Sequence, residues 1–287
     1  MSGVILLAVC TQAAQAQTTT DIAPPDERGY SYFLGIAQQA VTYREDSRSQ
    51  PVKSEARSRS PLLITGALFA LAPDTLVSLH SETTFFPGRS TERWTAIGTS
   101  LGGVTLTDPL VQSNGFSLSQ STNQLAVHQR VHKDFFATGG FNFHTQSFKR
   151  YSFVAGPDNA VTLPAGTTVE ESTSELLLNL GVELESESVR SASRHYSLRA
   201  SVGLPLWRRT MNTEAPDVRF TGAKGYDLEV EGRYSWAVLH SLQVGIWSKY
   251  AIARRSAESQ SLAGHVYELP SNRSTSTALG VDVLWKY

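Results

Sequence analysis

His195 and Ser197 come closest to a catalytic pair in this sequence. Residues i and i+2 share one face of a β-strand, and an imidazole beside a hydroxyl can serve as base toward a serine nucleophile. The sequence offers this pair no obvious third partner. We therefore expect a polar pair without catalytic function and predict that the protein is not an enzyme. A lipid hydrolase that uses His195 and Ser197 stays as an alternative.

Histidines and carboxylates also recur at spacings that raise the question of metal binding. His80 and Glu82 share a strand face, and so do His128 and His132. Imidazole and carboxylate suit several divalent ions. Four residues of strand span roughly 13 Å, too far for His128 and His132 to bind one ion. We predict no metal site and no cofactor.

These side chains lie on segments with a period of two, which is typical of β-strands with one apolar and one polar face. The pattern is most regular at the C-terminus, where apolar or aromatic residues alternate with smaller or polar ones from Thr277 onward. The first set is Thr277, Leu279, Val281, Val283, Trp285 and Tyr287, and the second is Ala278, Gly280, Asp282, Leu284 and Lys286.

A long alternating strand that ends on an aromatic residue resembles the last strand of bacterial outer-membrane β-barrel proteins. The resemblance is to a class of proteins. It implies an antiparallel transmembrane β-barrel in the outer membrane of a Gram-negative bacterium. It also implies that Val283, Trp285 and Tyr287 form a signal for the barrel assembly machinery.

Length and composition agree with one such domain. The chain has 287 residues and a net charge of −1, which gives no indication of nucleic-acid binding. The sequence contains no run of eighteen apolar residues, so it predicts no transmembrane helix. We predict a signal peptide over residues 1–16, which holds Cys10, a short periplasmic segment over 17–28, and the barrel over 29–287.

The alternation predicts about ten strands, an even number as in bacterial barrels. Residues 87–120 are ambiguous and leave twelve strands possible. Short turns are expected near 72–74, 133–134 and 238–240. Long connections are expected at 44–60, 87–120, 155–170, 207–224 and 256–272. Short periplasmic turns that alternate with long extracellular loops are typical of outer-membrane barrels.

The polar faces of these strands would line the lumen with charges of both signs. A barrel of about this size is nearly filled by its own side chains, and unpaired buried charges are costly. We therefore expect a plugged lumen held by an ionic network, with a narrow, porin-like polar channel as the alternative. The expected network consists of Glu82, Arg130, Glu183, Arg199, Asp227, Glu229, Glu231, Arg233, Lys249 and Asp282.

Basic residues close the upper ends of several strands. By the alternation, Arg44, Lys149, Arg208 and Arg254 continue the lipid-facing rows. Phosphates favour Arg and Lys as charge-assisted donors, so we hypothesise that these four residues bind lipopolysaccharide, with solvated loop charges as the alternative. The predicted function is a structural or partner-binding barrel, and a barrel component of an envelope or secretion complex stays possible.

Overall fold

The computed structural model describes residues 30–47, 50–164, 166, 168–186 and 193–286. These residues form β-strands joined by turns and irregular segments. In this part of the chain, no helix is long and apolar enough to cross a membrane. The predicted signal peptide, the predicted periplasmic segment and Tyr287 lie outside the described residues.

The strands form one antiparallel sheet that closes on itself because β1 pairs with both β2 and β16. Ten strands make the ring in the order β1, β2, β3, β7, β8, β9, β10, β12, β13 and β16, which confirms the expected fold class. Their bounds are β1 Tyr30–Asp46, β2 Val52–Ala72, β3 Thr75–Thr84, β7 Leu110–His132, β8 Phe135–Ala155, β9 Thr168–Glu185, β10 Arg194–Asn212, β12 Gly225–Leu239, β13 Leu242–Arg255 and β16 Ser271–Lys286.

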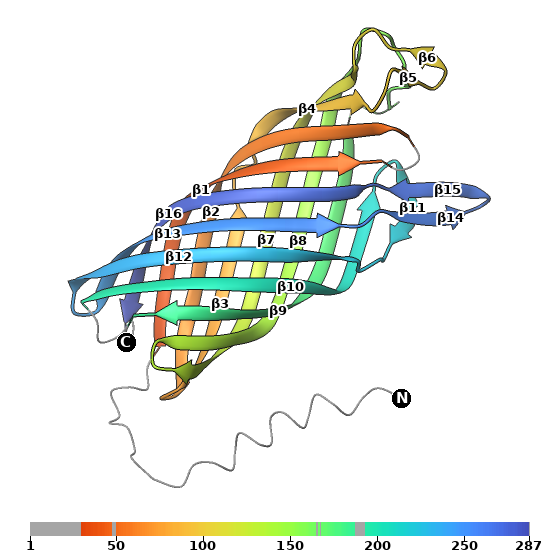
Figure 1. The fold of residues 1–287 in the computed structure, drawn as a ribbon. Coiled ribbons are helices and arrows are strands. Elements are labelled where there is room, and N and C mark those ends of the chain that lie inside the picture. Colours follow the sequence, from red (N-terminus) through yellow and green to blue (C-terminus); the bar gives the residue numbers. More distant parts are fainter. Residues whose placement is uncertain (1–29, 48–49, 165, 167, 187–192, 287) are drawn as a thin grey trace, which may run out of the picture.

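The two ends of the barrel differ. At one end, here called the turn end, tight turns join β2 to β3, β7 to β8 and β12 to β13. At the other, the loop end, the connections carry further strands (Figure 1). These are β4 Arg89–Ala96, β5 Ser100–Leu101, β6 Val104–Thr105, β11 Ala215–Phe220, β14 Glu258–Leu262 and β15 His265–Leu269. β4 takes the place of β3 at this end, because it pairs with both β2 and β7.

Four of the five connections predicted as loops, 44–60, 87–120, 207–224 and 256–272, are largely strand. Residues 52–60, expected in a loop, open the 21-residue β2, with Ser54, Ala56 and Ser58 facing inward and the charged residues between them facing outward. Residues 87–120 contain β4 to β6 and the start of β7, yet add no eleventh or twelfth member to the ring. The sequence prediction stopped the strands where their apolar residues end, but their backbone pairing continues further.

The outer surface changes from apolar to polar along each strand. On β1 the outward residues Tyr32, Leu34 and Ile36 are apolar and exposed, and the next outward residues run through Gln38 to Arg44. The paired strand β16 shows the same order, from Trp285 at the turn end upward. A membrane strand needs only about 9–11 residues, so the upper parts of these strands extend beyond the apolar band.

A β-bulge in β10 reverses the alternation near the loop end. The register with β9 shifts between Pro205 and Trp207, so that Leu206 is an additional residue. Proline cannot donate a ladder hydrogen bond and is found in strands mainly at edges and bulges. Beyond the bulge, Trp207 faces outward and Arg208 faces the lumen.

Candidate functional site

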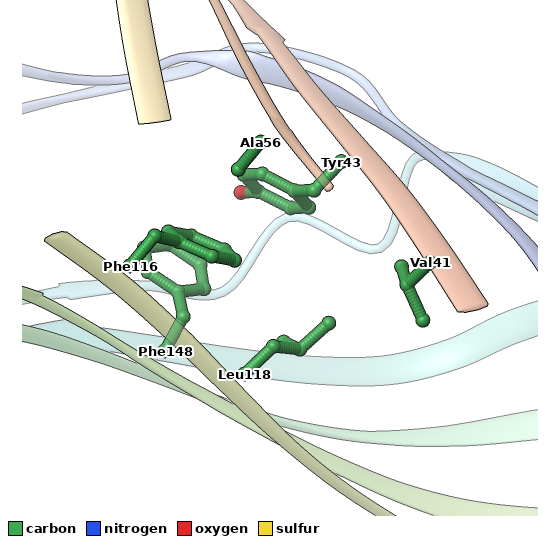
Figure 2. Close-up of a cluster of buried hydrophobic side chains, with 6 residues drawn as sticks. All are labelled: Val41, Tyr43, Ala56, Phe116, Leu118 and Phe148. Carbon is green, nitrogen blue, oxygen red and sulfur yellow. The ribbon is translucent and has the colours of Figure 1, made fainter. Parts of the chain in front are cut away.

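A cluster of buried aromatic side chains lies inside the barrel near the loop end. Tyr43 of β1, Phe116 of β7 and Phe148 of β8 pack together with ring centroids 5.1 to 5.7 Å apart (Figure 2). Val41, Ala56 and Leu118 complete this cluster, here called the aromatic plug. Phe116 is 0% exposed and Tyr43 is 1% exposed, so these rings are packed into the barrel interior. Apolar packing of this kind leaves little room for water.

Arg150 connects the aromatic plug to charged residues on two other strands, β1 and β4. Its guanidinium donates hydrogen bonds of 2.7 Å to Glu45 and of 2.7 and 3.0 Å to Glu92. Glu92 also accepts hydrogen bonds from Ser54 and Asn114. The guanidinium carbon lies 4.6 Å from the Phe148 ring centroid, a distance at which a cation–π contact stabilises the arrangement. Glu45 and Glu92 are both almost fully buried, and Arg150 provides the nearest positive charge to both.

A second group of charges, here called the central network, lies deeper in the lumen. Lys249 pairs with Glu82 and lies 3.7 Å from Glu229. Arg199 reaches Glu229 at 3.2 Å and Glu231 at 2.7 Å. These pairs connect β3, β10, β12 and β13 across the interior. A cavity of about 100 Å³ borders Glu82, Lys249 and Glu229 and continues toward Arg255 near the loop end.

Further ionic contacts lie toward the turn end. Arg233 donates a 2.7 Å hydrogen bond to Asp282. His128 contacts Glu183 at 2.6 Å through Nδ1 and Ser78 at 2.7 Å through Nε2. The predicted network residues therefore line the lumen, where Asp227 borders the cavity, except that Arg130 lies at the turn-end rim.

Arg130 is the network residue whose surroundings differ from the prediction. It is about one-third exposed and pairs with Asp74, 3.2 Å away in the β2–β3 turn. It also donates to the backbone carbonyl of Lys133 and lies over the Phe136 ring. Arg130 therefore fastens two turns together and takes no part in the central network.

The pair predicted as a possible catalytic site is not assembled as one. His195 Nε2 contacts Glu185 Oε1 at 2.8 Å, and its Nδ1 is buried without a hydrogen-bond partner. Neither ring nitrogen therefore bonds to Ser197. The serine that does contact a histidine is Ser78, and no spacing in the sequence indicates this contact because Ser78 and His128 lie on different strands, 50 residues apart.

Basic residues form a row on the outer surface above the apolar band. Arg273 of β16 is the register partner of both Arg44 of β1 and Arg254 of β13, so three exposed arginines lie side by side. With a rise of about 3.3 Å per residue and a strand tilt of about 40°, Arg44 lies about 30 Å from Tyr32 along the barrel axis. A membrane band of about 25 Å that began at Tyr32 would end just below this row.

Two of the four residues predicted to bind lipopolysaccharide need separate description. Arg208 does not face lipid, because the β10 bulge turns it inward, where it is 4% exposed and bonds to Glu175 at 2.7 Å. Lys149 faces outward as expected and pairs with Glu170 at 3.1 Å. Arg273 was missed by the sequence prediction, although the same alternation that runs through Thr277 and Thr275 reaches it.

The closed antiparallel ring and its outward apolar band define the class. The chain is an outer-membrane β-barrel protein. Its location is the outer membrane, where the apolar band faces lipid. Neither a protein-family model nor a curated protein matches the sequence.

Solved structures of outer-membrane proteins align with this chain. The outer-membrane protease OmpT from Escherichia coli aligns with a TM-score of 0.63 at 9% identity, over 94% of this chain and 99% of that one. The translocator domain of the autotransporter NalP from Neisseria meningitidis aligns with a TM-score of 0.40 at 11% identity, over 98% and 93%. Ail from Yersinia pestis aligns with a TM-score of 0.34 at 9% identity, over 90% and 99%. At such identities the likeness concerns the fold alone.

Proposed function

We propose that this protein is a closed barrel with a structural or partner-binding role, which presents its loop end outside the cell. The observation that carries the proposal is the aromatic plug, held in place by Arg150 and its two carboxylates. Rings from β1, β7 and β8 meet inside the lumen, with ring centroids 5.1 to 5.7 Å apart. A continuous file of water or ions would have to displace them.

Conductance of the refolded, signal-free protein in a planar bilayer tests this proposal. We expect inserted wild-type protein to be silent, and the double variant Phe116→Ala/Phe148→Ala to conduct because it removes two of the three rings. The matched control Phe141→Ala/Phe143→Ala changes two exposed rings on the outer face of β8. Steady, salt-dependent openings of the wild-type barrel would overturn the proposal in favour of a narrow porin-like channel.

We further propose that the outer arginine row of Arg44, Arg254 and Arg273 binds the phosphates of lipopolysaccharide, and that Lys149, on β8 at the opposite side of the ring, is a separate contact. Like charges directly opposite each other on neighbouring strands destabilise a sheet. One acidic contact, from Glu55 to Arg44 at 2.9 Å, partly offsets this repulsion. An anionic headgroup at this height would offset the rest through charge-assisted hydrogen bonds.

Binding of purified lipopolysaccharide to the refolded barrel tests the row. The triple variant Arg44→Gln/Arg254→Gln/Arg273→Gln should bind at least about tenfold more weakly, given about 1.5–3 kcal/mol for each charged hydrogen bond. Arg130→Gln/Lys133→Gln/Arg194→Gln removes three basic residues at the turn end and should leave binding unchanged. Equal binding by the two triple variants would contradict the proposal.

A lipid or ester hydrolase is a second candidate, which rests on a different set of residues from those predicted. Ser78, His128 and Glu183 form a hydrogen-bonded chain of nucleophile, base and acid, with contacts of 2.7 and 2.6 Å. Ser78 and His128 are, however, 8% and 5% exposed, so we expect no reaction with substrate. Labelling of Ser78 by a fluorophosphonate, lost in His128→Gln, would establish the hydrolase and overturn this expectation.

A place in an envelope or secretion complex is a third candidate. The hairpin β14–β15 lies beyond the ring at the loop end, and β11 lies close to β14 there (Figure 1). Proteins that co-purify with the wild-type barrel, and that are lost when residues 258–269 are replaced by a short turn, would support this candidate.

A further inference from the structure

We propose that His80, Glu82 and Glu231 form a binding site for one divalent transition-metal ion of the zinc type inside the lumen. The proposal goes beyond the role of the closed barrel and does not depend on it. It differs from the sequence prediction of no metal, because Glu231 comes from β12, far from the other two residues in the chain.

The three side chains offer one nitrogen and two carboxylate oxygens that all lie within 4.8 Å of one another. His80 and Glu82 lie on the inward face of β3, with His80 Nε2 3.6 Å from Glu82 Oε1. Zinc accepts both ligand types, with bonds of about 2.0–2.2 Å. A tetrahedral ion would bring the ligand atoms to about 3.4 Å from one another, a contraction of at most about 1.4 Å that side-chain rotation can supply.

The imidazole of His80 is the observation that points to a ligand. Its Nε2 is buried and has no hydrogen-bond partner, and the side chain as a whole is only 10% exposed. A buried polar nitrogen without a partner is costly, so such groups are rare in native proteins. The His80 and Phe33 rings pack in a T-shaped contact with their centroids 5.4 Å apart, which limits rotation of the imidazole away from the carboxylates.

Each carboxylate of the site is already oriented by a cation. Glu82 directs one oxygen to Lys249 and the other toward His80. Glu231 directs one oxygen to Arg199 at 2.7 Å. Hydrogen bonds to the ligands from outside a metal site fix their orientation in this way and contribute to affinity.

The charge balance of the surrounding lumen also favours an added cation. Within the described part of the chain, the central network, the cavity lining and their ion-pair partners include seven carboxylates and four buried permanent cations. The carboxylates belong to Glu82, Glu171, Glu175, Glu183, Asp227, Glu229 and Glu231, and the cations are Arg199, Arg208, Lys249 and Arg255. Buried carboxylates that lack a counter-charge are strongly unfavourable. A divalent ion would reduce this excess, and the cavity that borders Glu82 extends toward the upper lumen.

The test is titration of the refolded, metal-free barrel with Zn²⁺ alone, followed by calorimetry and by metal content after desalting. The protein must carry no histidine tag. We expect one zinc per barrel, and affinity at least about tenfold lower in His80→Gln and in Glu231→Gln. Heat-modifiable migration on a gel shows that each variant has folded.

His128→Gln is the matched control, because His128 is also a lumen histidine beside a glutamate, but both of its nitrogens are bonded. This variant should retain one zinc with wild-type affinity. Absence of saturable zinc binding by the folded wild type would overturn the proposal. So would equal affinity in wild type and in a folded His80→Gln or Glu231→Gln variant.

Discussion

Arg150 of β8 donates a 2.7 Å hydrogen bond to Glu45 of β1, a residue 105 positions earlier in the chain. At the loop end, β2, β4 and β7 separate the two strands along the barrel wall, so the bond crosses the interior. The same guanidinium bonds to Glu92. One cation thus joins three strands through two carboxylates that have almost no contact with solvent.

Replacing Arg150 with methionine should destabilise the barrel strongly. The change leaves two buried carboxylates without their cation, and removing one partner of a buried pair costs about 3–5 kcal/mol. Denaturant unfolding of the refolded protein in detergent measures the loss. The triple variant Glu45→Gln/Glu92→Gln/Arg150→Met should recover part of it, and a triple variant as unstable as the single one would show that packing, rather than charge, is responsible.

The variant Arg208→Gln distinguishes the lumen position of Arg208 from the lipid-facing position predicted from the sequence. Because Arg208 is buried against Glu175 and also donates to the carbonyls of Gly222 and Lys224, the variant should lose stability by about 3–5 kcal/mol. Lipopolysaccharide binding should stay at the wild-type level. Weaker lipopolysaccharide binding at unchanged stability would place the side chain outside the barrel.

Asp158 should make the packing of two loops depend on pH. The hydroxyl of Thr107, 2.7 Å away, and the backbone amides of Asp108 and Thr107 donate to this carboxylate and lower its pKa. The contribution of ionised Asp158 to the packing of the loops is therefore fully present above the ordinary pKa of about 3.9. It is lost as the pH falls through the lower pKa of the folded state.

Hydrogen exchange of the Thr107 and Asp108 amides, corrected for intrinsic rate, checks this dependence. Protection should be high at neutral pH and should fall at strongly acidic pH. Asp158→Asn should abolish the difference between the two conditions. Protection that is equal at both pH values in the wild type would show that Asp158 does not hold the loops together.

The variant Trp285→Ala tests the proposed assembly signal at the C-terminus. Trp285 faces outward near the end of β16, and we propose that Val283, Trp285 and Tyr287 are recognised by the barrel assembly machinery during insertion. Trp285→Ala should lower the amount of heat-modifiable barrel in the outer membrane of cells, whereas refolding in detergent should be little affected. Equal losses in both experiments would indicate a defect in stability alone.

Much of the wall could be predicted from the sequence. Alternation along β1, β9, β13 and β16 distinguishes the lipid face from the lumen face because side-chain direction in a strand is a local property with a period of two. The aromatic-ending strand indicated the class of protein, and the comparison of folds confirmed it. The ends of the strands were predicted less well, since pairing continues where the outer residues become polar, as at Lys53 to Arg59.

Only the tertiary structure decided which side chains meet inside the barrel. Arg150 pairs with Glu45 and Lys249 pairs with Glu82 only after the ring has closed and every register is set. The same closure brings Glu231 close to His80. One inserted residue at the β10 bulge moved Arg208 from the outer surface to the lumen, because a shift of one residue reverses the face of every later side chain. The sequence determined the two faces of the wall; contacts across the lumen depend on closure, which brings together residues that no local pattern connects.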